Sequence, residues 1–281
     1  MAATAVCYHR QMPSYLLAIV LSLSTGAPPA ARAAGDQLAT ARKLYNQGDY
    51  DRALEAAREA QSNPATASPA RLVIGRIRLE RYRQTAQRGD LEEARIALKN
   101  LDARALDARE RVELQVGYAE ILYFDDRFGA AAEVLDSVLD SSATLGAEAH
   151  ERALDWWASA LDRHAQTLSP AERGPVYARV IERMEEELRS DPAATSAAYW
   201  LVAAARGAGD LERAWAAASA GWVRAALAPD HGAALRADLD RLVTQALIPD
   251  RAARLTVRDR RQAMASMTSE WEEFKSNWSR N

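Results

Sequence analysis

Apolar residues recur along most of this chain at the spacing of amphipathic helices. After Gly89, the residues Leu91, Ala94, Leu98 and Leu101 fall at i, i+3, i+7 and i+10, a spacing that places them on one helical face. Similar stripes recur further along the chain. The pattern predicts helices over 36–47, 71–88, 112–124, 147–168, 176–189, 197–206, 232–246 and about 250–281, with further helices after turns at 48, 89, 126 and 209.

A short phrase repeats at these turns. Gly48-Asp49-Tyr50-Asp51-Arg52-Ala53-Leu54 recurs at 89–95 and 209–215, and a degenerate copy occupies 126–132. Glycine can end the first helix with positive φ, and the following Asp can cap the second helix. The large apolar residue anchors the turn. We expect the two helices to approach most closely at the alanine of each phrase, namely Ala53, Ala94, Ala131 and Ala214.

This phrase resembles the tetratricopeptide repeat (TPR). Gly48, Tyr50, Ala53, Ala60 and Pro64 carry the match, and the resemblance covers most of residues 34–230. It implies an all-α fold, a right-handed α-solenoid of about five TPR-like helical hairpins. The turns lie 41, 37 and 83 residues apart instead of at multiples of about 34. We therefore interpret 147–189 as a fourth, stretched hairpin, and the spacing leaves the shape of the groove open.

The repeat phrase stops before residues 231–281, which we interpret as C-terminal capping helices. A solenoid needs such a cap to cover its last apolar face. Trp271, Phe274 and Trp278 form an aromatic stripe at i, i+3 and i+7. The stripe either caps the solenoid or docks into a partner.

Residues 1–33 have the pattern of a secretory signal peptide. Arg10 precedes an eight-residue apolar core at 16–23, which is too short to span a bilayer. Helix-breaking Gly26, Pro28 and Pro29 follow, and the small-residue motif at 31–33 predicts cleavage after Ala33. The prediction is a periplasmic or secreted protein with no membrane span after cleavage. An uncleaved anchor or a disordered tail is the alternative.

Composition agrees with a helical, exported chain. There are 61 Ala in 281 residues, and 33 of the 36 basic residues are Arg, which suggests a bacterial host with a GC-rich genome. The single Cys, Cys7, excludes an intramolecular disulfide framework and a multi-cysteine metal site. The net charge of −3 argues against a nucleic-acid partner.

No catalytic constellation stands out. His150, His164 and His231 lack metal-ligand spacing, and the chain has no Gly-x-Ser-x-Gly and no phosphate-binding loop. The adjacent carboxylates at 125–126 and 185–187 point in different directions on a helix. Arg-Gly-Asp at 88–90 is explained by the repeat turn. We therefore predict a non-enzymatic protein without metal or cofactor.

The groove implied by the TPR resemblance is lined by the first helix of each hairpin. Six Arg against one acid, Glu80, occupy 71–88, and Arg suits carboxylate recognition. The prediction is a groove for an extended peptide or an acidic protein segment, although an ordinary solvated face would carry the same residues. The predicted groove residues are Arg42, Tyr45, Asn46, Arg76, Arg83, Gln87, Glu120, Tyr123, Phe124, Tyr199 and Arg206.

Two other functions stay open from the sequence. The chain could be an assembly or scaffold subunit that acts through its convex face or its aromatic C-terminal helix. It could also be an accessory subunit of an envelope enzyme, or such an enzyme itself.

Overall fold

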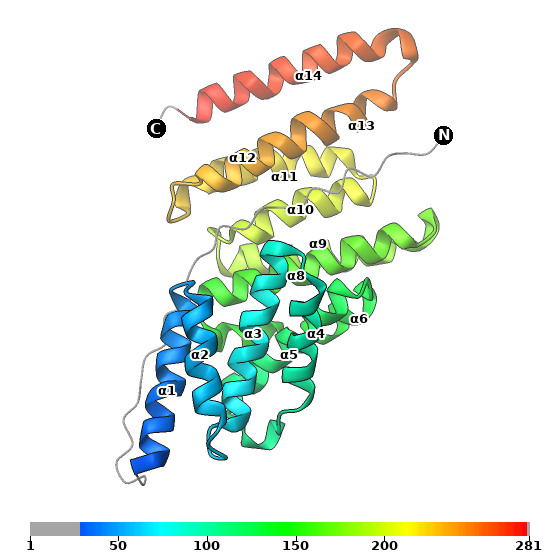
Figure 1. Cartoon of the computed structure of the whole chain (residues 1–281). Coiled ribbons are helices and arrows are strands. Elements are labelled where there is room, and N and C mark those ends of the chain that lie inside the picture. The colour runs from blue at the N-terminus through cyan, green and yellow to red at the C-terminus, as the bar shows by residue number, and fades with distance from the viewer. Residues whose placement is uncertain (1–28, 280–281) are drawn as a thin grey trace. The chain divides into compact units, whose positions relative to one another are not determined.

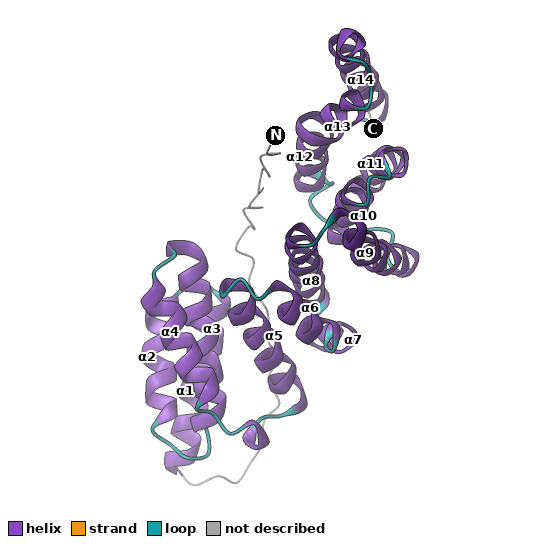
Figure 2. Ribbon diagram, turned by 90° about the vertical axis from the view of Figure 1, so that its right-hand side faces the viewer, coloured by secondary structure: helices purple, strands orange, loops and turns teal. Residues whose placement is uncertain are grey.

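The computed structural model describes residues 29–279, and within this range every regular element is a helix and no strand occurs (Figures 1 and 2). The predicted all-α class is therefore confirmed. The signal-peptide prediction for 1–33 falls almost wholly outside the described residues. Within 29–279, no helix combines the length and the apolar character needed to cross a bilayer.

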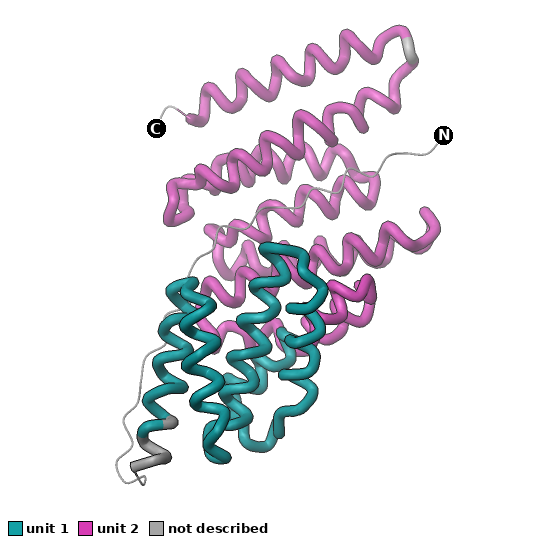
Figure 3. Tube along the Cα trace, viewed as in Figure 1, with its two compact units in different colours: residues 1–117 teal, residues 118–281 magenta. Residues whose placement is uncertain are grey.

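The chain divides into two compact units, residues 1–117 and 118–281 (Figure 3). The described part of the first unit contains α1 (Pro29–Asn46), α2 (Tyr50–Gln61), α3 (Ala67–Thr85), α4 (Arg88–Lys99), the short η1 (Ala103–Ala105) and most of α5 (Ala108–Phe124). Helices α1 to α4 each pack against the next one in the chain. Their core includes Leu44, Leu54, Val73 and Ile77.

Glycine allows α3 and α4 to come close together. A Cβ at Gly75 would lie 2.4 Å from Leu98 Cδ2, so a side chain at this position would collide with α4. Ala53 and Ala94, which the sequence placed at close helix contacts, are fully buried. The abundance of alanine in this unit thus serves close helix packing.

The second unit holds the larger core. Its further helices are α6 (Phe128–Asp136), α7 (Leu139–Ser142), η2 (Ala143–Leu145), α8 (Ala147–Thr167), α9 (Pro170–Ser190), α10 (Thr195–Gly207), α11 (Leu211–Arg224), η3 (Ala225–Leu227), α12 (Ala233–Leu242), η4 (Val243–Leu247), α13 (Ile248–Ala253) and α14 (Val257–Trp278). Helix α10 packs against α8, α9 and α11, and α6 packs against α8. Trp157, Met184, Leu239 and Trp271 lie fully buried in the core.

Three predicted turns have the expected backbone. Gly48, Asp126 and Gly209 have φ of 76°, 57° and 79°. Asp49 and Asp210 are N-caps whose carboxylates accept a hydrogen bond from the backbone three residues on. The glycine-aspartate phrase therefore forms the predicted helix–turn–helix at two of its copies.

The turn at Gly89 was placed wrongly. Helix α3 ends at Thr85, Ala86 takes the left-handed conformation with φ 54°, and α4 begins at Arg88. Gly89 and Asp90 therefore lie inside the first turn of α4. Asp90 caps nothing, because its carboxylate accepts a hydrogen bond from Arg78 at 2.6 Å.

The helix expected to end before Pro249 continues through it. The segment η4 is π-helical, and Ile248 N–H donates to Val243 O across its wider turn. In a regular α-helix the Pro249 ring would clash with the carbonyl four residues earlier, and a wider turn relieves that clash.

The expected final helix, about 250–281, is instead two helices. Helix α13 ends at Ala253, and α14 restarts after Thr256, whose hydroxyl donates to Asp259 Oδ2 at 2.6 Å.

Two helices begin earlier than expected because proline is tolerated in a first helical turn. Helix α1 begins at Pro29 instead of 36. Helix α9 begins at Pro170 instead of 176, after a capping box between Ser169 and Glu172. Helix α8 confirms its prediction to within one residue at its C-terminal end.

Candidate functional site: a charged cluster on α1, α3 and α5

Two predicted groove residues of the first unit, Arg42 and Arg76, meet around acidic residues of α5. Arg42 forms an ion pair with Glu110. Glu110 is held in place by the start of α5, since Asp107 N–H donates to Glu110 Oε2 at 2.9 Å and Glu110 N–H donates to Asp107 Oδ1 at 2.7 Å. This reciprocal pair is a capping box. The local fold of α5 thus fixes one carboxylate of the site.

Glu113 supplies the second carboxylate, one helical turn further along α5. Arg109 Nε lies 3.5 Å from Glu113 Oε1. Burial raises the pKa of Glu113, and the positive charges of Arg42, Arg76 and Arg109 oppose that rise. Burial has the larger effect, so the ionised Glu113 is poorly compensated in spite of three nearby guanidinium groups.

Close helix packing brings Arg76 to α5. A Cβ at Gly117 would lie 2.9 Å from Leu98 Cδ1 and 3.8 Å from Arg76 Cδ. Gly117 therefore leaves room for the Arg76 stem beside α5. The guanidinium groups of Arg42, Arg76 and Arg109 thus lie around the two carboxylates of α5.

The other predicted groove residues of this unit have different surroundings. The Tyr45 ring lies 5.9 Å from that of Tyr50, and Arg83 is paired with Glu80. Asn46 is buried, with its Oδ1 lacking a hydrogen bond within the described chain. Gln87 is exposed at the N-cap position of α4.

In the second unit, most predicted groove residues make contacts within that unit. The Tyr123 hydroxyl is 2.9 Å from Ser159 Oγ, and the Tyr123 ring lies 4.7 Å from Trp156. Burial raises the Tyr123 pKa. The other contacts are Phe124 with Trp156 at 5.5 Å, Tyr199 with Trp200 at 5.4 Å, and Arg206 Nε with Asp250 Oδ2 at 2.7 Å, while Glu120 is buried.

Sequence reasoning missed Arg109, Glu110 and Glu113. Two signals could have found them. Asp107 and Glu110 have the spacing of a capping box, and Arg109 and Glu113 have the i, i+4 spacing of a helical ion pair. The helix was predicted to begin at 112, whereas α5 begins at Ala108, so Arg109 and Glu110 lay outside the predicted helix.

A second polar cluster lies around Asp162 on α8. The Tyr177 hydroxyl donates to Asp162 Oδ1 at 2.9 Å, and Gln166 Nε2 donates to Oδ2 at 2.7 Å. Burial raises the pKa of both Asp162 and Tyr177. A Cβ at Gly207 would lie 2.4 Å from the Tyr177 ring. The cluster therefore joins α8, α9 and α10 by close packing and hydrogen bonds.

Ser142, His150 and Glu187 are arranged like a nucleophile, a base and an orienting acid. Ser142 Oγ lies 2.8 Å from His150 Nδ1, and His150 Nε2 lies 3.1 Å from Glu187 Oε2. Ser142 is fully buried, however, and its hydroxyl donates to Leu139 O at 2.5 Å. A substrate could not reach this hydroxyl, so the arrangement fastens α7 to α8 and α9.

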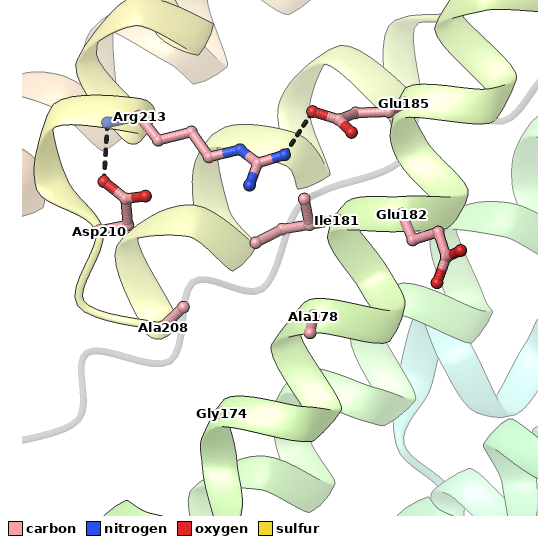
Figure 4. Close-up of a pocket in the computed structure, with 8 residues that line it drawn as sticks. All are labelled: Gly174, Ala178, Ile181, Glu182, Glu185, Ala208, Asp210 and Arg213. Carbon is pink, nitrogen blue, oxygen red and sulfur yellow. Dashed lines mark hydrogen bonds and ion pairs between the residues drawn. The ribbon is translucent and has the colours of Figure 1, made fainter.

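An open cleft of about 310 Å³ lies between α9 and the turn from α10 to α11 (Figure 4). Ala178, Ile181 and Ala208 contribute its apolar lining. Arg213 reaches across to Glu185 and forms an ion pair with it. The cleft lacks converging buried polar groups of the kind that position a small molecule. Within the described range, no group of three or more His, Cys, Asp or Glu is arranged to hold a metal ion.

The predicted aromatic stripe is buried unevenly. Trp271 is 0% exposed, stacks on Phe274 with ring centroids 5.6 Å apart, and donates from Nε1 to Asp240 Oδ1 at 2.9 Å. Trp278 is 47% exposed. Trp271 is thus part of the core of the second unit, and Trp278 lies at its edge.

Comparisons with protein-family models, with curated proteins and with solved structures find no match to this chain.

Proposed function

We propose that this protein is an exported, non-enzymatic interaction module that binds an extended acidic segment of a partner protein. In this proposal the helices form a right-handed α-solenoid of about five TPR-like hairpins, with 231–281 as the C-terminal cap. The shared turn geometry at Gly48-Asp49 and Gly209-Asp210 supports the repeat assignment. Trp271, which is buried in the core, supports the capping role.

The charged cluster on α1, α3 and α5 is the observation that carries the binding proposal. In this cluster three arginines lie around Glu110 and Glu113, and burial disfavours the ionised form of Glu113. A carboxylate from a partner can accept hydrogen bonds from the planar guanidinium groups in two parallel contacts. The partner segment is therefore expected to be rich in Asp and Glu.

Export is the second part of the proposal. The signal-like pattern of 1–33 and the placement of the lone Cys7 within it support a periplasmic or secreted chain that folds without disulfides. Mass determination of the N-terminus of the exported chain tests this part independently of binding. A chain starting after Ala33 is expected, and an intact Met1 in the exported fraction would contradict it.

The binding proposal is tested with a fluorescein-labelled ten-residue peptide of alternating Asp and Glu. We expect the double variant Arg42→Glu/Arg76→Glu, which reverses two charges of the cluster, to weaken its affinity by about tenfold or more, as measured by fluorescence anisotropy. The matched control is Arg58→Glu/Arg104→Glu, which changes two exposed arginines of the same unit by the same charge. Equal affinities for the two double variants would refute the charged cluster as the binding surface.

A further inference from the structure

The last helix, α14, leaves a long face unpartnered. Among the residues of α14 whose side chains the structure describes, 258–278, Trp271 is the one that lies fully buried. The face turned away from Trp271 carries exposed Arg258 and Gln262, then the small residues Ala265 and Ser269, and then exposed Glu273. Small side chains at the middle of such a face allow another helix to approach closely.

The two ends of this face carry opposite charges. Arg258 lies near its start and Glu273 near its end. Neither forms an ion pair within residues 29–279. An antiparallel helix of the same sequence would compensate both ends at once.

We propose that α14 pairs with α14 of a second copy of this chain in an antiparallel, two-fold symmetric dimer centred near Ser266. Residues equally far from the centre then face each other. Arg258 lies opposite Glu273 of the partner subunit. Gln262 faces Ser269 of the partner subunit, so each contact occurs twice. This surface is independent of the charged cluster on α1, α3 and α5.

A single pair of helices buries a small area, so the dimer is weak and reversible. Sedimentation velocity of the full chain across about 1 to 200 μM is expected to show a concentration-dependent monomer–dimer equilibrium. High salt should shift it towards monomer, because its contacts include exposed charges. A chain that stays monomeric over this whole range overturns the proposal.

Charge reversal tests the pairing itself. Arg258→Glu and Glu273→Arg should each raise the dimer Kd by about tenfold or more, because each turns two attractive contacts into repulsive ones. The double variant Arg258→Glu/Glu273→Arg should restore the Kd to within about threefold, since both contacts become attractive again. Arg58→Glu, an exposed arginine on α2, is the control and should leave the Kd unchanged.

The alternatives give different results. In a parallel pair each of these residues would face its own copy, so single reversals would not weaken the dimer and the double variant would rescue nothing. That outcome, or a loss in the single variants that the double variant does not restore, overturns the antiparallel pairing. Thermal melts by circular dichroism confirm that the variants are folded, which is expected because both side chains are exposed.

Discussion

Glu113 is the residue at which burial and ion pairing compete most clearly. It lies among three arginines, and the pKa of its carboxyl is nevertheless raised because burial penalises the charged form more than the arginines favour it. Burial thus opposes the ionised form of Glu113, which is the form that pairs with the surrounding arginines. This is the physical basis for expecting the cluster to accept a carboxylate from outside.

The raised pKa predicts how Glu113 affects stability at different pH values. The folded state binds this proton more tightly than the unfolded state, whose pKa is near 4.5. The free energy of unfolding therefore falls as pH rises from 4.5 through the raised folded value. The Glu113→Gln variant cannot ionise and escapes this loss. We expect the melting temperature of this variant, relative to that of the parent, to increase as pH rises from about 4 to 7.

Thermal melts in buffers across that pH range check this prediction. The control is Glu55→Gln, which changes an exposed glutamate on α2. A constant difference between the Glu113→Gln variant and the parent at every pH would show that Glu113 titrates alike in the folded and unfolded chains.

Among the helical elements, the same glycine-aspartate phrase produces two different structures. At Gly209-Asp210 it forms a turn and a cap. At Gly89-Asp90 it lies within α4, where Asp90 is buried against Arg78. In the second case the carboxylate has a tertiary partner, Arg78 on α3, in place of a backbone N–H of its own helix.

The two aspartates are therefore expected to differ in their effect on stability. Asp210→Ala removes an N-cap and should lower the free energy of unfolding by about 1 kcal/mol. Asp90→Ala removes the buried one of the two carboxylates paired with the largely buried Arg78, leaving the exposed Glu93, and should cost about 3 kcal/mol. Urea denaturation measures both. Adding Arg78→Met should recover much of the loss in the Asp90→Ala variant, and an equal cost for the two alanine variants would contradict the assigned roles.

A turn or helix end can be predicted from the sequence when the residues that cause it lie within a few positions of it. The turns at Gly48 and Gly209 were predicted because glycine and a capping aspartate act within a few residues. The turn at Ala86 was missed because alanine rarely takes the left-handed conformation, and Asp90 pairs with a residue of another helix. Arg42 and Arg76 were chosen from repeat positions, whereas their acidic partners on α5 depend on which helices pack together.

At the scale of the whole molecule, the two compact units each have their own core. In the second unit the core extends into α14 through Trp271, which contacts Trp215 and Trp222 of α11. Lys275, one turn later, adds an ion pair to Asp240 on α12. A few side chains thus attach a long, otherwise exposed helix to the rest of its unit.

This attachment predicts a large contrast between two tryptophans of one stripe. Trp271→Ala removes a fully buried indole and should lower the free energy of unfolding of the second unit by about 3 to 5 kcal/mol. Trp278→Ala changes a side chain that is 47% exposed and should cost less than about 1 kcal/mol. Chemical denaturation followed by circular dichroism measures both. Similar losses for the two variants would mean that α14 does not rest mainly on Trp271.

In the π-helical segment η4, the number of residues is as important to the structure as their identity. Deleting one residue here, such as the exposed Gln245, would let the wide turn close into a regular α-helical turn. The Pro249 ring would then clash with the carbonyl four residues earlier, so the helix would kink or break at this point. Replacing Gln245 keeps the number of residues and the wide turn, so a substitution there is expected to cost less stability than the deletion.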